Sequence, residues 1–497
     1  NTQNSPARIM NLIIHKIKKI YDEVAKKEKN KVRSEMVEHN HKVMAIVKRM
    51  NRTTNEVDEQ EAKDDLKEEK NNRRDHLRRT EMRFRERIDH FYRNENGKMT
   101  AATFRHTKEE KFETKILRIE EENQVITQEE QIREKFRSHL AASIADPNRE
   151  KSQPISQKML ELHIQHPAHI PSQEENEEAN KEFSIEEITR VLNNMQNEST
   201  PGPSGTTKSF FLWLISMIPN LFTKGLNEYL NHHTESSAFE WIKKRKIVFI
   251  PKPGRTRNKL ENYRPISLLE VYYKVIAKLL ANKLGKCIHK NISKSQFGFI
   301  PTRTVSEAST YLQTIINRAK RTGEAIQIVF LDAKAAFDLT RTEATTAMMK
   351  HLGAPDELVK KLNALTNKGV FSIEMFGDSS IETEILSGTG QGDPASSDKY
   401  DATHEGNTLL YKAKKFNWSL RDGDELVDPV SFADDTSIPV QLQSLEDYEE
   451  LLNFFDSLSA ITGYAINQAK TEILAFNTDP VLINEVNNLG KLQSRPE

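Results

Sequence analysis

The sequence predicts an α+β protein in which helices back an antiparallel sheet, preceded by a long charged helical extension. Two observations support this fold class. From about residue 325 the segments follow one another as strand, helix, hairpin, helix, strand pair, helix and strand, an order typical of a sheet with its helices on one face. Before about residue 137, charged and amide residues dominate while Gly and Pro are rare, which favours long solvated helices.

Length, charge and cysteine content limit what the chain can be. A chain of 497 residues has room for about two to four structural units with a large core. Lys plus Arg and Asp plus Glu are both 73, so the overall charge favours neither nucleic acid nor membrane as a partner. The single cysteine, Cys287, excludes an intramolecular disulfide and a cysteine-rich zinc site within this stretch, which fits a reducing intracellular compartment.

The most apolar segment is "FFLWLISMIPNLF" at 210–222, which is too short for a bilayer and is interrupted by Pro219. We expect a buried helix with a break here and no membrane span. The chain begins at Asn1 without a methionine or an apolar signal region, which indicates processing or a fragment of a longer protein.

The first 190 residues divide into two regions by composition. Residues 1–137 form the charged helical extension, and 138–190 combine a linker with the helix that leads into the next region. The linker is expected over about 150–185, where Pro and acidic residues punctuate the chain. "FSIEEITRVLNNM" then begins a helix, with Ser184 as its N-cap and Glu187 as the capping-box partner three residues on.

A basic segment, "IKKRKIVFIPKPGRTRNKL", combines a strand with a Pro/Gly loop. It contains eight Lys or Arg and no acid between Trp241 and Leu260. Basic loops of this kind meet phosphates, and the run from Lys243 to Lys259 predicts salt-sensitive RNA binding. A solvated hairpin and a nuclear-localisation run remain alternatives on composition alone.

The second half of the chain is an alternation of short strands and helices. "AIQIVFLDAKAAFD" predicts a strand that ends at Asp332 and opens a helix, and "VFSIEMFGDSSIETEIL" predicts a hairpin around Gly377 and Asp378. In "GTGQGDPASS" we expect Asp393 to be an N-cap and Pro394 the first helical residue. A strand pair, a helix in "SLEDYEELLNFFDSLSAIT" and a turn with a short strand in "GYAINQAKTEILAF" follow.

Two adjacent acids interrupt the strand pair in "VSFADDTSIPV", so that Asp434 and Asp435 lie at its turn. Alone, such a pair could simply satisfy the turn backbone. Asp332 ends another strand about a hundred residues earlier, however, so three carboxylates can converge at one sheet edge. Acidic sites without cysteine select hard cations, and Mg²⁺ in particular binds through a few carboxylates together with substrate phosphates. Two such ions can stabilise the attacking and leaving oxygens of a nucleotidyl transfer.

Eight motifs, in this order, resemble those of reverse transcriptases of non-LTR (LINE-type) retrotransposons. "STPGPSG", "IVFIPKPG", "NYRPISLL" and "SQFGFIPTR" resemble finger motifs, and "VFLDAKAAFD", "SGTGQGDP", "FADD" and "GYAINQAKTEIL" resemble palm motifs. The resemblance runs from about Ser199 to Phe476. It implies a right-hand polymerase with fingers over 191–324 and a palm over 325–497, the thumb being largely absent.

The resemblance implies that Asp332, Asp434 and Asp435 are catalytic carboxylates that hold two Mg²⁺ ions, with Mn²⁺ as an alternative. Adjacent strand residues point to opposite faces unless the turn brings them together, so of the two neighbours we favour Asp434 as the ligand. Lys470 in "NQAKTEI" matches the residue that the family is thought to use as the general acid, which protonates the departing pyrophosphate. This role requires a cation near the developing phosphate charge. As a lone lysine it would simply be solvated.

Substrate contacts follow from the resemblance in the same way. Lys252 in "PKPG" and Arg264 in "NYRPIS" match residues that hold the incoming triphosphate, although each could be only a surface charge. Phe337 matches the steric gate that excludes a ribonucleotide's 2′-hydroxyl, and its alternative is a plain core residue. Gln391 and Gly392 resemble the segment that lies against the nascent base pair.

Some features are weaker or depart from the family. Arg303 in "FIPTR" is a weaker candidate for contact with the template strand. After "GDPASS" the family continues into an apolar helix, whereas "DKYDATHEGN" is polar, so we expect different packing behind the site or different template contacts. The chain stops at Glu497 without an evident primer grip, thumb, endonuclease, RNase H region or zinc knuckle. We interpret it as a fragment, which calls independent activity into question.

The resemblance implies an RNA-directed DNA polymerase that copies element RNA with dNTPs from a DNA primer, often a nicked chromosomal target. The helical extension would hold the template RNA, and the protein would act in the nucleus and in a cytoplasmic ribonucleoprotein. Two alternatives stay open: a catalytically silent, reverse-transcriptase-derived protein that binds nucleic acid, and a related intron-encoded or telomerase-like enzyme, against which the finger motifs speak. The sequence sets neither the target site nor the oligomeric state.

Overall fold

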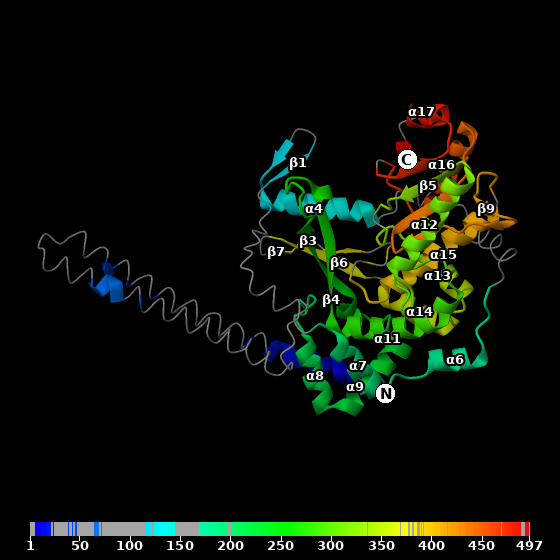
Figure 1. Ribbon diagram of the computed structural model, residues 1–497. Coiled ribbons are helices and arrows are strands. Elements are labelled where there is room, and N and C mark those ends of the chain that lie inside the picture. Colours follow the sequence, from blue (N-terminus) through cyan, green and yellow to red (C-terminus); the bar gives the residue numbers. More distant parts are fainter. Residues whose placement is uncertain are drawn as a thin grey trace, which may run out of the picture. The chain divides into compact units, whose positions relative to one another are not determined.

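The computed structural model describes most of the chain from residue 116 onward and pieces of the part before it (Figure 1). The described residues are 5–20, 23, 38, 42, 45–46, 64–68, 71, 116, 118–121, 124–144, 168–196, 200–334, 336–367, 369–375, 378–379, 382–384, 388, 390, 392–414, 416–468, 470–488 and 493–496. By their contacts the residues fall into two units, one of Asn1–Asn11 with Ile116–Glu497 and the other of Leu12–Lys115. In the second unit the described residues are helical, and most of the predicted extension lies outside them.

The first sheet contains the strands predicted around the three acids. Its order is β11-β12-β5-β13-β14, with bounds Val430–Phe432, Asp435–Val440, Ile326–Leu331, Glu472–Phe476 and Gln493–Pro496. The pairs β11–β12, β12–β5 and β5–β13 are antiparallel, as predicted, but β13 and β14 are parallel. The α+β class is confirmed, and the prediction of a purely antiparallel sheet is wrong at this edge.

Helices cover both faces of this sheet, not one as predicted. On one face α12 (Val305–Thr322) packs through Ile315 and Ala319 against Ile326 and Ile328 of β5. Gln327 and Val329, which alternate with them and therefore point to the opposite face, are buried as well. The reason is visible in the sequence of β5, "IQIVFL", which is a nearly continuous apolar run typical of a strand buried on both sides.

A second sheet joins strands that the sequence did not connect. Its order is β4-β3-β6-β7, with β8 beside β6, and the bounds are Tyr263–Leu269, Lys244–Pro251, Val370–Met375, Asp378–Ser379 and Thr383–Glu384. β3 pairs antiparallel with β4 but parallel with β6, more than a hundred residues later in the chain. The hairpin predicted around Gly377 is present as β6–β7, although the turn residue itself lies outside the described residues.

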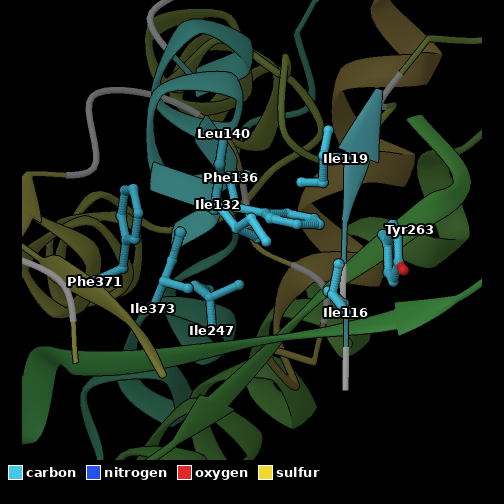
Figure 2. Packing of buried hydrophobic residues seen from close by; sticks show 9 residues of the cluster. All are labelled: Ile116, Ile119, Ile132, Phe136, Leu140, Ile247, Tyr263, Phe371 and Ile373. Atoms are coloured by element: carbon cyan, nitrogen blue, oxygen red, sulfur yellow. The ribbon is translucent and has the colours of Figure 1, made fainter. Parts of the chain in front are cut away.

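A β-hairpin and a helix pack on the second sheet. The strands β1 (Ile119–Glu121) and β2 (Gln124–Ile126) interrupt the predicted helical extension, and α4 (Glu129–Ile144) crosses its predicted end at residue 137. Figure 2 shows the buried side chains between these elements and the sheet: Ile116, Ile119, Ile132, Phe136, Leu140, Ile247, Tyr263, Phe371 and Ile373. The all-helical prediction was wrong here because it did not anticipate this apolar surface, which β1 helps to cover.

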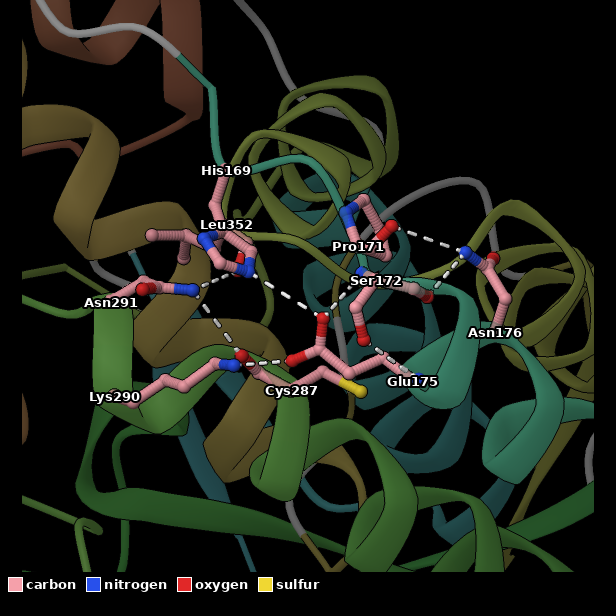
Figure 3. Close-up of polar contacts among 9 residues, drawn as sticks. All are labelled: His169, Pro171, Ser172, Glu175, Asn176, Cys287, Lys290, Asn291 and Leu352. Atoms are coloured by element: carbon pink, nitrogen blue, oxygen red, sulfur yellow. Dashed lines mark hydrogen bonds and ion pairs between the residues drawn. The ribbon is translucent and has the colours of Figure 1, made fainter.

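The predicted linker contains a helix, α6 (Gln173–Asn180), whose N-cap is Ser172. A capping box closes it, in which Glu175 accepts a hydrogen bond from the Ser172 amide, and the same carboxylate forms an ion pair with Lys290 (Figure 3). These contacts hold the pKa of Glu175 down at about 2, the Lys290 hydrogen bond being the main cause. The next helix, α7 (Ile185–Asn194), begins with the predicted Ser184 and Glu187 capping box.

The remaining helices surround the sheets. They are α8 (Lys208–Met217), α9 (Pro219–Glu228), α10 (Glu240–Lys243), α11 (Val271–Ile288), α13 (Thr342–His351), α14 (Asp356–Thr366), α15 (Ser396–Lys414), α16 (Leu445–Thr462) and α17 (Pro480–Asn488). The predicted break lies between α8 and α9, with Pro219 in the first turn of α9. Within the described part of the chain, no single helix is long and apolar enough to cross a membrane. One bent pair, Lys208–Met217 with Pro219–His233, has the length and composition of a membrane span, and no other observation supports that role.

Two predicted helix starts are displaced. The segment after Asp332 pairs with a later loop instead of opening a helix, since the Lys334 amide donates to the Ala465 carbonyl, and α13 begins only at Thr342. Asp393 accepts from the Ala395 amide at 2.9 Å, but this contact closes a turn that contains Pro394, and α15 begins at Ser396. In both places tertiary pairing or a local turn overrides the helix-start signal.

Candidate active site

The strand pair β11–β12 ends in a tight turn that carries two of the predicted acids. Phe432 is paired with Asp435, and Ala433 and Asp434 form the turn between them; we call Phe432–Asp435 the acidic turn. Ala433 has a φ of +58°, a left-handed conformation that residues other than glycine adopt in tight turns. Asp434 is exposed at the tip, and Asp435 is the first residue of β12. The two-strand interpretation of "VSFADDTSIPV" is therefore confirmed.

Asp332 lies beside this turn because of the register of β12 with β5. Thr436 is paired with Leu331, so the next step of the antiparallel register brings Asp435 opposite Asp332. Burial raises the pKa of Asp435, and the neighbouring carboxylates of Asp434 and Asp332 raise it further. The structure thus brings the three carboxylates close enough to repel one another.

The face of the sheet that carries Asp435 and Asp332 is open at this end. Alternation along the strands places Phe330 and Phe432 on the same face, and these aromatic side chains are 38% and 37% exposed. Two partly exposed aromatic rings beside a carboxylate cluster form a surface on which bases or sugars can pack. The opposite face, which carries Ser431 and Thr436, is buried.

Lys470 is held at the acids by the loop between α16 and β13. The Asn467 amide donates to the Asp332 carbonyl at 2.7 Å, and Ala333 forms a bridge with Ile466. The Lys470 ammonium lies 3.3 Å from the Asp332 carboxylate. Gly463 permits the approach of this loop, since a Cβ on it would lie 1.9 Å from the Leu339 carbonyl oxygen. The structure therefore places the predicted Lys470 beside the predicted acids.

The donor set suits an ion that arrives with a substrate. Among the described residues no group of three or more His, Cys, Asp or Glu side chains is arranged to hold a metal ion by itself. Mg²⁺ binds through one or two carboxylates plus substrate phosphates and keeps several waters, so a complete protein cage is not required. Burial is the main cause of the raised pKa of Asp435, and the neighbouring carboxylates of Asp434 and Asp332 add a repulsion that a cation would relieve. On this criterion Asp332, Asp434 and Asp435 fit divalent ions.

The predicted phosphate-binding residue Lys252 lies close to Lys470, and the second one, Arg264, lies close to Lys252. Burial lowers the pKa of Lys252, and the nearby charges of Lys470 and Arg264 lower it further. Lys252 donates to the Glu261 carbonyl at 2.7 Å, while Arg264 is exposed on β4. The loop between β3 and β4 thus adds positive charge next to the carboxylates, an arrangement suited to a triphosphate.

The basic segment is less accessible than predicted. Lys243 and Arg245 are only 5% and 3% exposed. Lys243 donates to the Asn367 carbonyl at 3.0 Å, and Arg245 lies 3.9 Å from the buried Asp393 carboxylate. These two cations are structural: Lys243 ends α10 and is bound to the Asn367 carbonyl, and strand alternation turns Arg245 of β3 inward. The exposed part is the loop that carries Arg255, Arg257 and Lys259.

The remaining predicted residues have different environments. The Phe337 ring packs at 5.0 Å from Tyr400 and 6.1 Å from Phe299. Arg303 donates to the Ser293, Gln296 and Ile292 carbonyls, so its guanidinium braces that turn, and contact with a template stays a prediction. Gly392 is exposed with a φ of +103°, and Gln391 lies outside the described residues.

Gly298, which no predicted site included, lies directly against the acidic turn. The segment before it pairs with β11: the Ser431 amide donates to Ser295 and the Phe297 amide donates to Ser431, at 2.9 and 2.7 Å. A Cβ on Gly298 would lie 2.0 Å from the Ala433 nitrogen. The available signal was the glycine between two phenylalanines in "QFGFI", where a small residue at an otherwise apolar contact indicates close backbone approach.

The polar segment noted after "GDPASS" forms a buried helix. In α15 the buried polar side chains include Ser396, Asp398, Lys399, Asp401, Thr403, His404, Glu405, Asn407 and Thr408. Their partners come from around the helix, for example Ser293 for Glu405 at 2.6 Å and Gln296 for Asp401 at 3.0 Å. Hydrogen bonds and ion pairs therefore pack this helix behind the site, and a difference from the family's packing stays a prediction.

Comparison with known proteins agrees with this geometry. Residues 250–490 match the family described as reverse transcriptase (RNA-dependent DNA polymerase). These residues form a reverse transcriptase domain. The chain is 22% identical over 302 residues to the transposon TX1 uncharacterized 149 kDa protein of Xenopus laevis, a match that covers 61% of this chain. It is 26% identical over 310 residues to the RNA-directed DNA polymerase from mobile element jockey of Drosophila melanogaster, which covers 59% of this chain.

A third relative is the Pol polyprotein from the type-2 retrotransposable element R2DM of Drosophila melanogaster, 26% identical over 194 residues, or 39% of this chain. The matched segments span 23%, 32% and 18% of these three proteins, so this chain corresponds to less than a third of their length. The predicted resemblance to a reverse transcriptase of the non-LTR type is confirmed.

Proposed function

We propose that this reverse transcriptase domain is an active RNA-directed DNA polymerase that extends a DNA primer on an RNA template by nucleotidyl transfer. The observation that carries the proposal is the convergence of Asp332, Asp434 and Asp435 at the end of the first sheet, with the Lys470 ammonium 3.3 Å from Asp332. In this proposal the first sheet is the palm, and the second sheet belongs to the fingers.

Each residue has a separate task. Asp332, Asp434 and Asp435 would hold two Mg²⁺ ions, which supply charge stabilisation for the attacking 3′-oxygen and the leaving pyrophosphate. Lys252 and Arg264 bind the triphosphate as cations, and Lys470 donates a proton to the departing pyrophosphate. Phe337 closes the sugar pocket against a 2′-hydroxyl. The template RNA, the primer or target DNA and action in the nucleus and a cytoplasmic ribonucleoprotein belong to the same proposal.

A catalytically silent nucleic-acid-binding protein is the second candidate. The presence of all three carboxylates together with Lys470 favours activity.

The deciding experiment is extension of a DNA primer on an RNA template with dNTPs and Mg²⁺. The parent chain is compared with Asp434→Ala and with Asp424→Ala, a matched control at an exposed acid in the turn between β9 (Arg421–Asp422) and β10 (Glu425–Leu426). Extension by the parent and the control, but not by Asp434→Ala, supports the polymerase. Binding of primed template without extension by any of the three would identify the silent protein instead.

A further inference from the structure

A histidine lies directly behind the acidic turn. His404 projects from α15 to the buried face of the first sheet, where its Nε2 lies 2.8 Å from the Ser431 hydroxyl and 3.4 Å from the Thr436 hydroxyl. Ser431 and Thr436 are paired across β11 and β12, and they are the last pair before the acidic turn. One imidazole thus bridges the two strands whose ends carry Asp434 and Asp435.

The same ring belongs to an aromatic row. His404 stacks on Tyr400 with ring centroids 5.7 Å apart and planes 13° apart, and its other neighbour is Tyr464 at 5.6 Å. Tyr400 in turn packs at 5.0 Å against Phe337, the residue assigned to the sugar pocket. His404, Tyr400 and Tyr464 are all buried, so the row is a rigid support rather than a surface.

The protonation state of His404 follows from its surroundings. Burial lowers its pKa to about 4, so the ring is neutral at physiological pH. Nδ1 has no hydrogen-bond partner within the part of the chain that the structure describes. A proton on Nδ1 would be a buried N–H without an acceptor, so the proton lies on Nε2. Nε2 then donates to the Ser431 hydroxyl, which can in turn donate to the Thr436 hydroxyl at 3.3 Å. The hydrogen bonds thus run from helix to β11 and on to β12.

We propose that His404 is a positioning residue for the polymerase reaction, which ties β11 to β12 behind the acidic turn and supports the sugar-pocket residue Phe337 through Tyr400. The proposal rests on the proposed function of this site. It explains why a polar residue occupies a buried position of α15, because an apolar side chain of the same size would leave the Ser431 hydroxyl without its partner at 2.8 Å.

The hydrogen bond of His404 to Ser431 and its stacking on Tyr400 can be tested separately. His404→Phe keeps a ring against Tyr400 but removes the hydrogen bond to Ser431, so the carboxylates lose their fixed spacing while the sugar pocket keeps its support. We expect about tenfold lower kcat and a higher Mg²⁺ concentration at half-maximal rate, with little change in KM for dNTP. Tyr400→Leu removes the ring that packs between His404 and Phe337, and we expect it to lower the preference for dNTP over rNTP.

The experiment measures primer extension by the parent, His404→Phe, Ser431→Ala, the double variant and Tyr400→Leu, with Mg²⁺ titrations and dNTP and rNTP kinetics. Thr403→Val is the matched control, because the Thr403 hydroxyl is also buried on α15 but bonds to Thr345 of α13 at 2.8 Å. His404→Phe and Ser431→Ala should each shift the Mg²⁺ dependence, and the double variant should be no worse than the poorer single variant, since both remove one hydrogen bond.

The outcomes separate this proposal from the proposed function. A parent that does not extend the primer refutes the polymerase, and the positioning role falls with it. A parent that extends, with His404→Phe and Ser431→Ala matching Thr403→Val in kcat and Mg²⁺ dependence, overturns the positioning role alone. If His404→Phe fails to fold, Ser431→Ala, which removes the partner hydroxyl from the other side, gives the same test.

Discussion

Replacement of Gly298 by alanine should disable the acidic turn through a steric effect of a single methyl group. A Cβ at this position would lie 2.0 Å from the Ala433 nitrogen, 2.7 Å from its Cα and 3.0 Å from the Phe432 carbonyl carbon. All three contacts are backbone atoms, so no side chain can rotate away. The turn that carries Asp434 and Asp435 has to move instead.

The size of the effect follows from the distances. Ordinary contact begins at 3.4 Å, so the turn must retreat by roughly 1.4 Å, and a misplacement of about 1 Å at a reacting centre costs on the order of 100-fold in rate. Forcing an extra methyl group into a packed interior also destabilises by about 1 to 3 kcal/mol. We therefore expect at least about a 100-fold loss of single-turnover primer extension, with a smaller loss of stability.

Gly406→Ala is the matched control. A Cβ on Gly406 in α15 would meet only the flexible Met348 side chain, at 3.1 Å from its Cγ, and alanine favours a helix interior over glycine by about 1 kcal/mol. Extension rates and urea unfolding are measured for the parent and both variants. Gly298→Ala with extension within threefold of Gly406→Ala would refute the steric argument.

Three further substitutions test the surroundings of the site. Arg245→Met should lower the free energy of unfolding in urea by about 3 kcal/mol, because it removes the buried cation beside the Asp393 carboxylate and leaves Lys399 as the remaining one; a loss below 1 kcal/mol would contradict this. Burial raises the pKa of Glu405 from 4.5 to about 7, so the folded state keeps a proton that the unfolded chain releases. The free energy of unfolding therefore falls by up to roughly 3 kcal/mol as the pH rises from about 4.5 through about 7. Urea unfolding measured at several pH values should show this fall in the parent, and Glu405→Gln should lack the part that is due to Glu405. Parallel pH profiles for parent and variant would show that Glu405 does not titrate in this range. Lys470→Met should slow primer extension with almost no change in unfolding, since the side chain is 60% exposed; equal rates in parent and variant would exclude a role in catalysis.

The sequence by itself determined the parts of the molecule that local patterns encode. The alternation in "VSFADDTSIPV" gave the strand pair and its acidic turn, and Ser184 with Glu187 gave a helix start, because both depend on a few neighbouring residues. The carboxylates and Lys470 were predicted as site residues through ordered motifs. The structure then placed Lys470 beside Asp332, which no local pattern predicts.

Only the tertiary structure decided which side chains of the basic strand and of α15 point inward. Arg245 looked like a phosphate-binding cation and is buried beside Asp393. The polar helix with His404 was expected to differ in packing or in template contacts, and only the structure shows that it is buried behind the acidic turn. The pairing of β3 with β6, and the approach of Gly298 to Ala433, join segments more than a hundred residues apart. Such contacts depend on partners distant in sequence, and a buried charge is tolerated only once its partner is in place.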